Sequence, residues 1–260
     1  PPKADTMCLL LLDRMLDDIE SAVALLKADF GEQAVGEIDC SHPHVHTFTV
    51  TLDGLEFWCS YLAMPVPADT LDVATVAQYS LLLSQEEKEA SINHKSFLML
   101  AQKGAGISLE EKRRVCWTFS RLCASLLGME GAVGVHAVGT GGLLIGKAHY
   151  FQQLQMMENK NPNNEEGYFP VPLWVWVYGY YQEKTFILRT AGLQDFGLPE
   201  LGFYNPTKLD AKELWDYLFS MSCLQITGRQ LYRNAALIPL DSKTEVVCKQ
   251  DGDILFFIGA

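Results

Sequence analysis

No hydrophobic run in this sequence is long enough to cross a lipid bilayer. The longest apolar stretches, residues 7–12 and 171–181, fall short of the roughly 20 residues that a membrane-spanning helix needs. Positive charge is scarce as well, because 20 Lys and Arg residues stand against 32 Asp and Glu residues, for a net charge of −12. A surface of that sign repels phosphate backbones and anionic lipids. We therefore expect neither nucleic acid nor a membrane as a partner. A basic protein partner would fit this charge, although the acidic surface could equally serve solubility alone.

The sequence also lacks any Cys-x-x-Cys pair, and its seven cysteines form an odd set. Most of them lie inside apolar runs, as in Met7-Cys8-Leu9, which is typical of buried, reduced thiols. A chain of 260 residues, 48% of them hydrophobic, can bury a core without disulfides or a structural metal. These features predict a cytoplasmic protein.

Motifs of nucleophilic and phosphate chemistry are missing. There is no Gly-x-Ser-x-Gly elbow, and residues 141–148 resemble a phosphate-binding loop only until Ala148, where a Ser or Thr hydroxyl is needed for Mg²⁺. We expect those glycines to form a loop between a strand and a helix. His94, His136 and His149 are single imidazoles beside apolar runs, for which a structural role is the commoner one. The sequence therefore assigns no catalytic residue and no cofactor.

One segment carries metal-ligand types at alternate positions, namely Cys40, His42, His44 and His46. On an extended backbone these four side chains would point to the same side, as in some zinc sites. However, Pro43 has no N–H to donate to a neighbouring strand. Residues on the same face of a strand also lie about 6–7 Å apart, so their side chains converge on one ion only if the strand bends. A solvent-facing loop is the favoured interpretation, and no metal ligand is assigned.

The first part of the chain, residues 1–104, predicts a ferredoxin-like βαββαβ module within an α+β fold. The strongest local signals are the capping-box spacing of Asp17 and Glu20 and the hairpin dipeptide Asp53-Gly54. The expected elements are a strand at 7–12, a helix at 17–30, strands at 45–51 and 55–63, a helix at 72–83 and a strand at 94–101.

Residues 105–260 predict a second, related α+β module, which either forms its own domain or shares one continuous mixed sheet with the first. Capping boxes at Ser108 and Asp210 begin two helices, and residues 159–167 are the most turn-rich segment. The expected helices are 108–128, 147–157 and 210–227, and the expected strands are 133–138, 173–180, 184–190, 233–238, 245–249 and 254–258.

Two features of the second half lead to specific expectations. Trp174, Trp176, Tyr178 and Tyr180 share one face of the strand predicted at 173–180, and we expect the two tryptophans to be buried rather than exposed for recognition. In the segment 190–201, two glycines lie five residues apart, which suggests backbone with positive φ and a turn anchored in the core.

That segment, Thr-Ala-Gly-Leu-Gln-Asp-Phe-Gly-Leu-Pro-Glu-Leu, resembles the "T-x-G-L-x-x-F-G-L-x-E-L" block of a bacterial family of uncharacterised proteins, domain of unknown function 4261. Segments 63–67, 94–100, 134–136 and 173–177 fall in the same order as in that family. The resemblance implies a soluble bacterial α+β protein, but it supplies no reaction and no catalytic residues. Where the family usually has Gly-Asp-Thr after the last helix, this chain has residues 228–231, Gly-Arg-Gln-Leu.

Two kinds of function stay open. The first is a non-catalytic protein-binding module of the immunity or adaptor type, which the acidic charge and the missing catalytic motifs favour. The alternative is a metal-dependent hydrolase in which Cys40, His42, His44 and His46 bind an ion that activates water. A structural subunit of a larger assembly would resemble the first hypothesis and differ only in stoichiometry.

Overall fold

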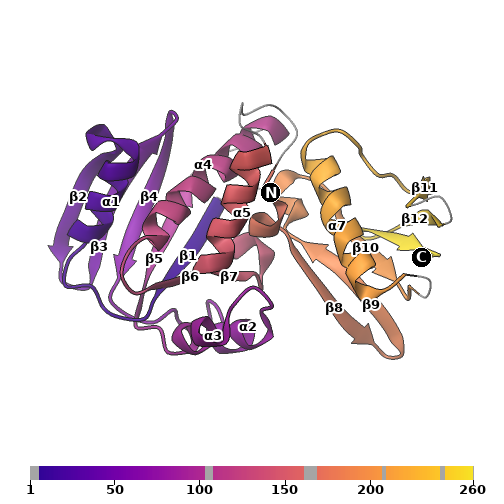
Figure 1. The fold of residues 1–260 in the computed structure, drawn as a ribbon, viewed down its shortest axis with the longest axis horizontal. Coiled ribbons are helices and arrows are strands. Elements are labelled where there is room, and N and C mark those ends of the chain that lie inside the picture. Colours follow the sequence, from indigo (N-terminus) through magenta and orange to yellow (C-terminus); the bar gives the residue numbers. More distant parts are fainter. Residues whose placement is uncertain (1–5, 103–107, 161–168, 207–208, 241–243, 260) are drawn as a thin grey trace. The chain divides into compact units, whose positions relative to one another are not determined.

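The protein is a mixed α+β chain that divides into two compact units, Pro1–Asn159 and Lys160–Ala260. The computed structural model describes residues 6–102, 108–160, 169–206, 209–240 and 244–259, without the side chains of 157–160. Its strands form two separate sheets, of seven and of six strands, one in each unit. The α+β class is thus confirmed (Figure 1).

The sheet of the first unit is antiparallel throughout, with the order β2-β3-β4-β5-β1-β6-β7. The apolar run at its centre, β1, is buried along almost its whole length, as expected of a strand covered on both faces. The seven strands are β1 (Thr6–Leu12), β2 (Val35–His42), β3 (Val45–Leu52), β4 (Leu55–Leu62), β5 (Ser96–Gln102), β6 (Ala132–Ala137) and β7 (Leu144–Gly146).

This topology is not ferredoxin-like. In a ferredoxin-like sheet the first strand would lie between the strands predicted at 55–63 and 94–101, whereas here β5 lies between β4 and β1. The sequence also did not reveal β2, because all but the first residue of this strand are exposed. After the first helix the chain enters the sheet at its far edge and meanders through β3 and β4 to β5, which pairs with β1.

The domain boundary expected after residue 104 is wrong for a related reason. Strand β6 pairs with the free side of β1, and β7 pairs with β6, so residues 132–146 complete the first sheet. The chain divides after Asn159 instead. The turn-rich segment 159–167 falls at this division, and its residues 161–167 lie outside the described part of the chain.

Three helices of the first unit, α1 (Glu20–Phe30), α4 (Leu109–Leu127) and α5 (Lys147–Lys160), lie on the same face of the sheet (Figure 1). In α4 the predicted capping box of Ser108 and Glu111 is present, and Val115 and Phe119 are buried as expected. The helix predicted at 72–83 is shorter, α2 (Val73–Tyr79), and is followed by an unpredicted helix, α3 (Gln85–Ile92).

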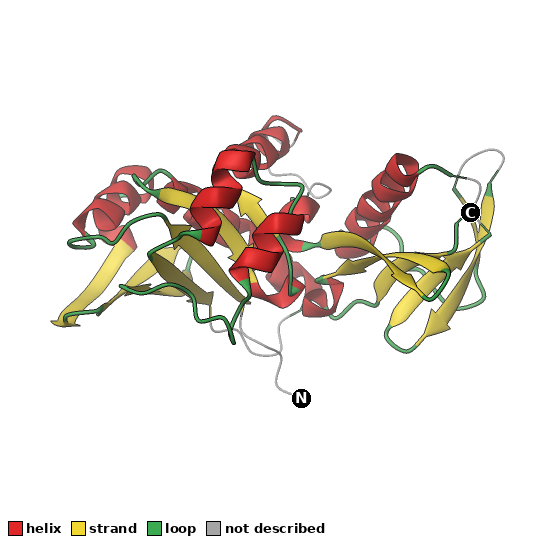
Figure 2. Ribbon diagram, turned by 90° about the horizontal axis from the view of Figure 1, so that it is seen from below, coloured by secondary structure: helices red, strands yellow, loops and turns green. Residues whose placement is uncertain are grey.

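The second unit has a mixed sheet with the order β11-β12-β13-β10-β9-β8, in which only β10 and β13 run parallel. Figure 2 shows the long helix of this unit, α7 (Ala211–Ile226), on one side of the sheet. The strands are β8 (Trp176–Gln182), β9 (Thr185–Ala191), β10 (Glu200–Tyr204), β11 (Leu237–Pro239), β12 (Glu245–Asp251) and β13 (Ile254–Ile258).

The aromatic residues near β8 follow the expectation in part. Trp174 is buried, but it belongs to a short helix, α6 (Val171–Trp174), because Pro172 favours a helical first turn. Trp176 is only half-buried and stacks on Tyr178, with 4.3 Å between ring centroids. Tyr180 is 36% exposed at the end of this row.

Candidate functional site

The cysteine and histidine segment forms a hairpin rather than one extended strand. Cys40 and His42 lie at the end of β2, His44 lies in the two-residue turn, and His46 lies on β3. The turn therefore separates the side chains, and the rings of His42 and His44 meet edge-on with centroids 6.2 Å apart. No group of three His, Cys, Asp or Glu residues in the described ranges is placed to hold a metal ion.

The glycine-rich segment does not form a phosphate-binding loop. Its apolar residues 144–146 are strand β7, and α5 begins directly at Lys147. The Glu87 carboxylate lies against Gly146, where it leaves no space for a side chain, and accepts the Ala148 N–H at 3.4 Å. An acidic side chain thus occupies the helix N-terminus, the position that a phosphate would need.

The buried histidines hold the backbone in place. His94 Nε2 accepts the Val66 N–H at 2.8 Å, while its Nδ1 donates to the Ser91 carbonyl at 2.7 Å. His136 Nδ1 donates to the Leu143 carbonyl at 2.9 Å. Burial lowers the pKa of both imidazoles, because a low dielectric disfavours the charged ring. Both rings therefore have a structural role.

None of the seven cysteines, all of which lie in the described ranges, forms a disulfide, and five of them are buried. Burial raises the pKa of Cys8 and of Cys59, so these thiols stay protonated and are poor nucleophiles. Cys40 is the exposed member of the set and lies near the end of β2. The buried thiols are therefore not candidates for a nucleophilic site.

The segment 190–201 is organised by one buried carboxylate. Glu200 accepts the Thr190 hydroxyl at 2.6 Å and the backbone N–H groups of Gly192 and Gln194 at 2.9 and 3.2 Å. The Thr190 oxygen in turn accepts the Leu201 N–H at 2.8 Å. The threonine, the first glycine and the glutamate of the block thus form a closed network that joins β9 to β10, which is a structural role.

The backbone around this network needs its glycines. Gly192 has φ 121° and Gly197 has φ 70°, so the positive φ that the sequence predicts is confirmed. Leu193 and Phe196 between them are buried, as expected of a turn anchored in the core.

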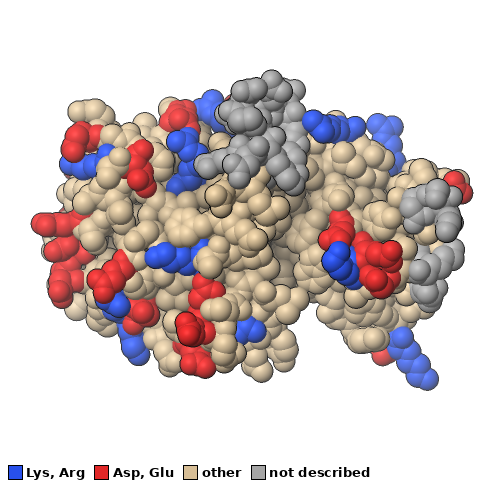
Figure 3. All heavy atoms as spheres, in the orientation of Figure 1, with Lys and Arg blue, Asp and Glu red and all other residues tan. Residues whose placement is uncertain are grey.

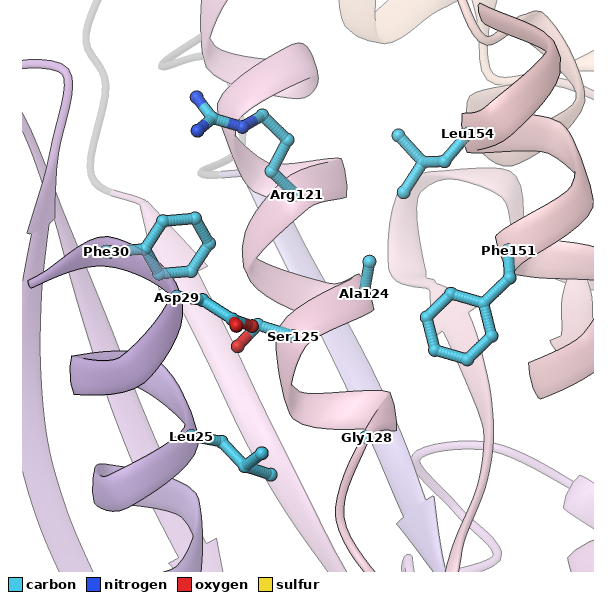
Figure 4. Close-up of a pocket in the computed structure, with 9 residues that line it drawn as sticks. All are labelled: Leu25, Asp29, Phe30, Arg121, Ala124, Ser125, Gly128, Phe151 and Leu154. Carbon is cyan, nitrogen blue, oxygen red and sulfur yellow. The ribbon is translucent and has the colours of Figure 1, made fainter. Parts of the chain in front are cut away.

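A concave feature lies on the helical face of the first unit, where α1, α4 and α5 border a groove of about 420 Å³ (Figure 4). Its floor is α4, which contributes residues at positions i, i+3, i+4 and i+7 and therefore one continuous face. The floor residues are Arg121, Ala124, Ser125 and Gly128, and the walls are Leu25, Asp29 and Phe30 of α1 and Phe151 and Leu154 of α5.

A salt bridge fixes the arginine at one end of this groove. Arg121 Nη1 lies 3.0 Å from Asp53 Oδ2, in the β3–β4 turn, and its guanidinium lies over the Phe30 ring at 5.5 Å. Thr118 Oγ1 donates to the same carboxylate oxygen at 3.3 Å. The positive charge of Arg121 is thereby balanced within the unit, and its stem forms part of the floor.

Two polar groups in the middle of the groove have no partner among the described residues. The Ser125 hydroxyl is buried and makes no hydrogen bond, an arrangement that costs about 1–3 kcal/mol in a folded protein. Asp29 is exposed and forms no ion pair within the described chain. The groove therefore offers a negative charge and an unused hydroxyl between apolar walls.

The surface around the groove combines apolar and acidic side chains, as the groove itself does. Figure 3 shows mainly uncharged atoms over the middle of the first unit, with acidic side chains gathered at the margin on the left of the view. Phe151 is 38% exposed, although it is a large apolar side chain. An apolar surface with acidic groups beside it favours an amphipathic, basic ligand.

No pattern used in the sequence analysis predicts this groove. The apolar spacing of α4 indicates its buried face, but it says nothing about the small residues Ala124 and Gly128 on the other face. Their i, i+4 spacing beside Arg121 is the signal that could have located the floor. One wall comes from α1, about 100 residues before the floor, and the other from α5, about 30 residues after it, and no local pattern links either segment to α4.

Comparison with family models, with curated proteins and with solved structures finds no match for this chain. Within the residues that the structure describes, no helix is both long and apolar enough to span a membrane.

Proposed function

We propose that this chain is a cytoplasmic, non-catalytic protein-binding module, and that its partner docks on the groove between α1, α4 and α5. The observation that carries the proposal is the combination of an unpartnered buried hydroxyl, Ser125, with an unpaired acid, Asp29, between apolar walls. A partner could satisfy both groups and cover the exposed ring of Phe151 in the same step.

The shape of the groove favours a helix as the bound segment. Small residues on the floor, Ala124 and Gly128, allow close approach, and the flanking helices provide the walls of a helix-in-groove site. Because Asp53 already neutralises Arg121, Asp29 supplies the uncompensated charge. We therefore propose an amphipathic helix with a Lys or Arg placed to meet Asp29, which agrees with the net charge of −12.

Two further observations support a binding role in a reducing compartment. The described residues contain free thiols instead of disulfides. The buried imidazoles of His94 and His136 and the 190–201 block serve structure. Membership of the domain of unknown function 4261 family stays a prediction from the sequence, as does the bacterial source.

The experiment places a photo-crosslinking phenylalanine derivative at Phe151 and, as a matched control, at Ala24, an exposed position of α1 outside the groove. We expect a protein from the native cells to crosslink at Phe151 and not at Ala24. The purified partner should then bind the wild type in calorimetry. Equal crosslinking at both positions, or a purified partner that does not bind, would rule out the groove as its site.

A further inference from the structure

The two faces of the sheet in the second unit differ in their exposure to solvent. Successive residues of a strand point to opposite faces, so the register of the strands shows which side chains share a face. Helix α7 lies on one side of the sheet (Figure 2), and one set of side chains is buried to the degree that a covering helix produces. The buried set comprises Val177, Leu188, Leu201, Phe203, Val246, Cys248, Leu255 and Phe257.

The opposite face carries a row of apolar side chains that crosses all six strands. Its two halves meet where Gly202 pairs with Phe256, two residues before Tyr204 and Ile258. All members of the row except Ile187 are between 36% and 60% exposed, and exposed apolar side chains that lie together mark an interaction surface. We call this side of the sheet the open face. In the order of the strands from β8 to β11, the row consists of Tyr180, Ile187, Tyr204, Ile258, Val247 and Leu237.

One cation, Arg189, lies beside this row. It is placed between Tyr178 on β8 and Gly202 on β10, and its guanidinium lies 5.8 Å from the centroid of the Tyr178 ring. Its Nε donates to the Thr190 carbonyl at 3.3 Å, but the side chain is partly exposed and forms no ion pair with a described residue. Glu200 on β10 does not pair with it, because both oxygens of that carboxylate accept hydrogen bonds within the 190–201 block. The charge of Arg189 is therefore not compensated by an ion pair.

The other charged side chains of this face lie too far from Arg189 to compensate it. Glu245, Lys249 and Asp251 alternate along β12, which is three strands away from β9 in the sheet. Three strand spacings amount to about 14 Å, which exceeds the distance of about 8 Å over which exposed charges interact at physiological ionic strength. The part of the open face formed by β8, β9, β10 and β13 thus combines aromatic side chains with one unpaired cation.

From this arrangement we infer that the open face binds an amphipathic helix of a partner protein, whose apolar side includes an Asp or Glu that meets Arg189. A carboxylate can accept two N–H groups of a guanidinium in a planar pair, and Tyr180 and Tyr204 are residues of the type that anchors interfaces. The row spans five strand spacings, about 24 Å, which is the length of a helix of about 16 residues. Such a helix would cover this face as α7, also 16 residues long, covers the other.

Other occupants suit the open face less well. A second copy of the chain packed face to face would bury the Arg189 of each copy against an apolar surface without a carboxylate, which is strongly unfavourable. Single-stranded nucleic acid also offers anionic groups beside stacking rings, but a net charge of −12 repels it. The open face belongs to the second unit and is separate from the groove, which favours a basic ligand.

The test titrates two 18-residue helical peptides into the full chain by calorimetry. Both peptides have the same leucine face, and one carries Glu at its centre where the other carries Gln. We expect the wild type to bind the Glu peptide about tenfold more tightly than the Gln peptide, because only the carboxylate forms an ion pair with Arg189. Arg189→Gln should abolish this preference. Arg233→Gln, which changes an exposed arginine between α7 and β11, should keep it.

A second pair of variants tests the apolar row without changing a charge. Tyr204→Ser should weaken binding of the Glu peptide about tenfold or more, whereas Tyr79→Ser, at an exposed tyrosine of the first unit, should leave it unchanged. Thermal unfolding verifies that all variants are folded. The inference would be overturned if neither peptide bound, or if the preference for Glu persisted in Arg189→Gln. A dimeric wild type that Tyr204→Ser makes monomeric, or a 15-nucleotide single-stranded DNA that binds through Arg189, would also overturn it.

Discussion

Replacing Glu200 tests whether one carboxylate holds the 190–201 block together. In Glu200→Ala, three donors lose their acceptor, but they differ in what they can find instead. The Thr190 hydroxyl can turn to the Leu201 carbonyl, 3.3 Å away, and the N–H of the exposed Gln194 can bind water. Only the buried Gly192 N–H is left without a partner.

The loss of stability in Glu200→Ala can be calculated from these three donors. One stranded donor costs about 1–3 kcal/mol, and two weakened hydrogen bonds cost about 1 kcal/mol each, so Glu200→Ala should destabilise by about 3–5 kcal/mol. Glu200→Gln keeps an oxygen for the two N–H groups, but it loses the charge and places an amide NH2 opposite the Thr190 hydroxyl, which must then turn to the Leu201 carbonyl; this predicts about 1–2 kcal/mol. For a unit of this size, each kcal/mol lowers the melting temperature by about 4–8 °C.

The assay is urea denaturation followed by tryptophan fluorescence in a background that lacks Trp58 and Trp117, so that all remaining tryptophans belong to the second unit. The matched control is Glu245→Gln, an exposed glutamate of β12, for which we expect a change within about 0.5 kcal/mol. If Glu200→Ala changed stability as little as this control, the carboxylate would not be what fixes the block.

Three further predictions test other parts of the account. Gly197→Val should cost about 1–3 kcal/mol in the same urea assay, because φ there is 70°, whereas Gly197→Asn should cost less; equal stability of both variants would contradict the strain argument. Burial lowers the pKa of His94 below the ordinary 6.5, so the contribution of the neutral ring to the free energy of unfolding should be fully present above pH 6.5 and should be lost as the pH falls below it. Urea midpoints measured at several pH values should show this dependence, and His94→Gln should make it weaker. Metal analysis after purification without chelator should find sub-stoichiometric zinc, iron, nickel and manganese; a stoichiometric metal that His42→Ala removes would restore the hydrolase hypothesis.

The elements that the sequence predicted well are those whose stabilising contacts join residues close together in the chain. The capping boxes at Ser108 and Asp210 formed because their partners lie three residues away, and Asp53-Gly54 made the expected two-residue hairpin. The box expected at Asp17 did not form, because Asp18 accepts the Glu20 N–H instead. Helix α3 was missed although Ser84 and Glu87 form a capping box, since few apolar residues follow them.

The features that the sequence did not predict depend on contacts between distant segments. Nothing local shows that β1 pairs with β5 and β6, more than 80 residues away, and that pairing decides both the topology and the boundary. Strand β2 lacks an alternating pattern because it is an exposed edge. The groove likewise needs three helices packed together before its floor and walls exist.

The most direct test of the proposed function is to fill the groove and measure the affinity for the partner that crosslinks at Phe151. Ala124→Trp places a large ring on the floor, and Ala24→Trp places the same ring on the exposed side of α1. Titration calorimetry should show that Ala124→Trp weakens binding by at least about tenfold, the equivalent of 1.4 kcal/mol, while Ala24→Trp binds like the wild type. Equal affinity of the two variants would show that the groove is not the binding site.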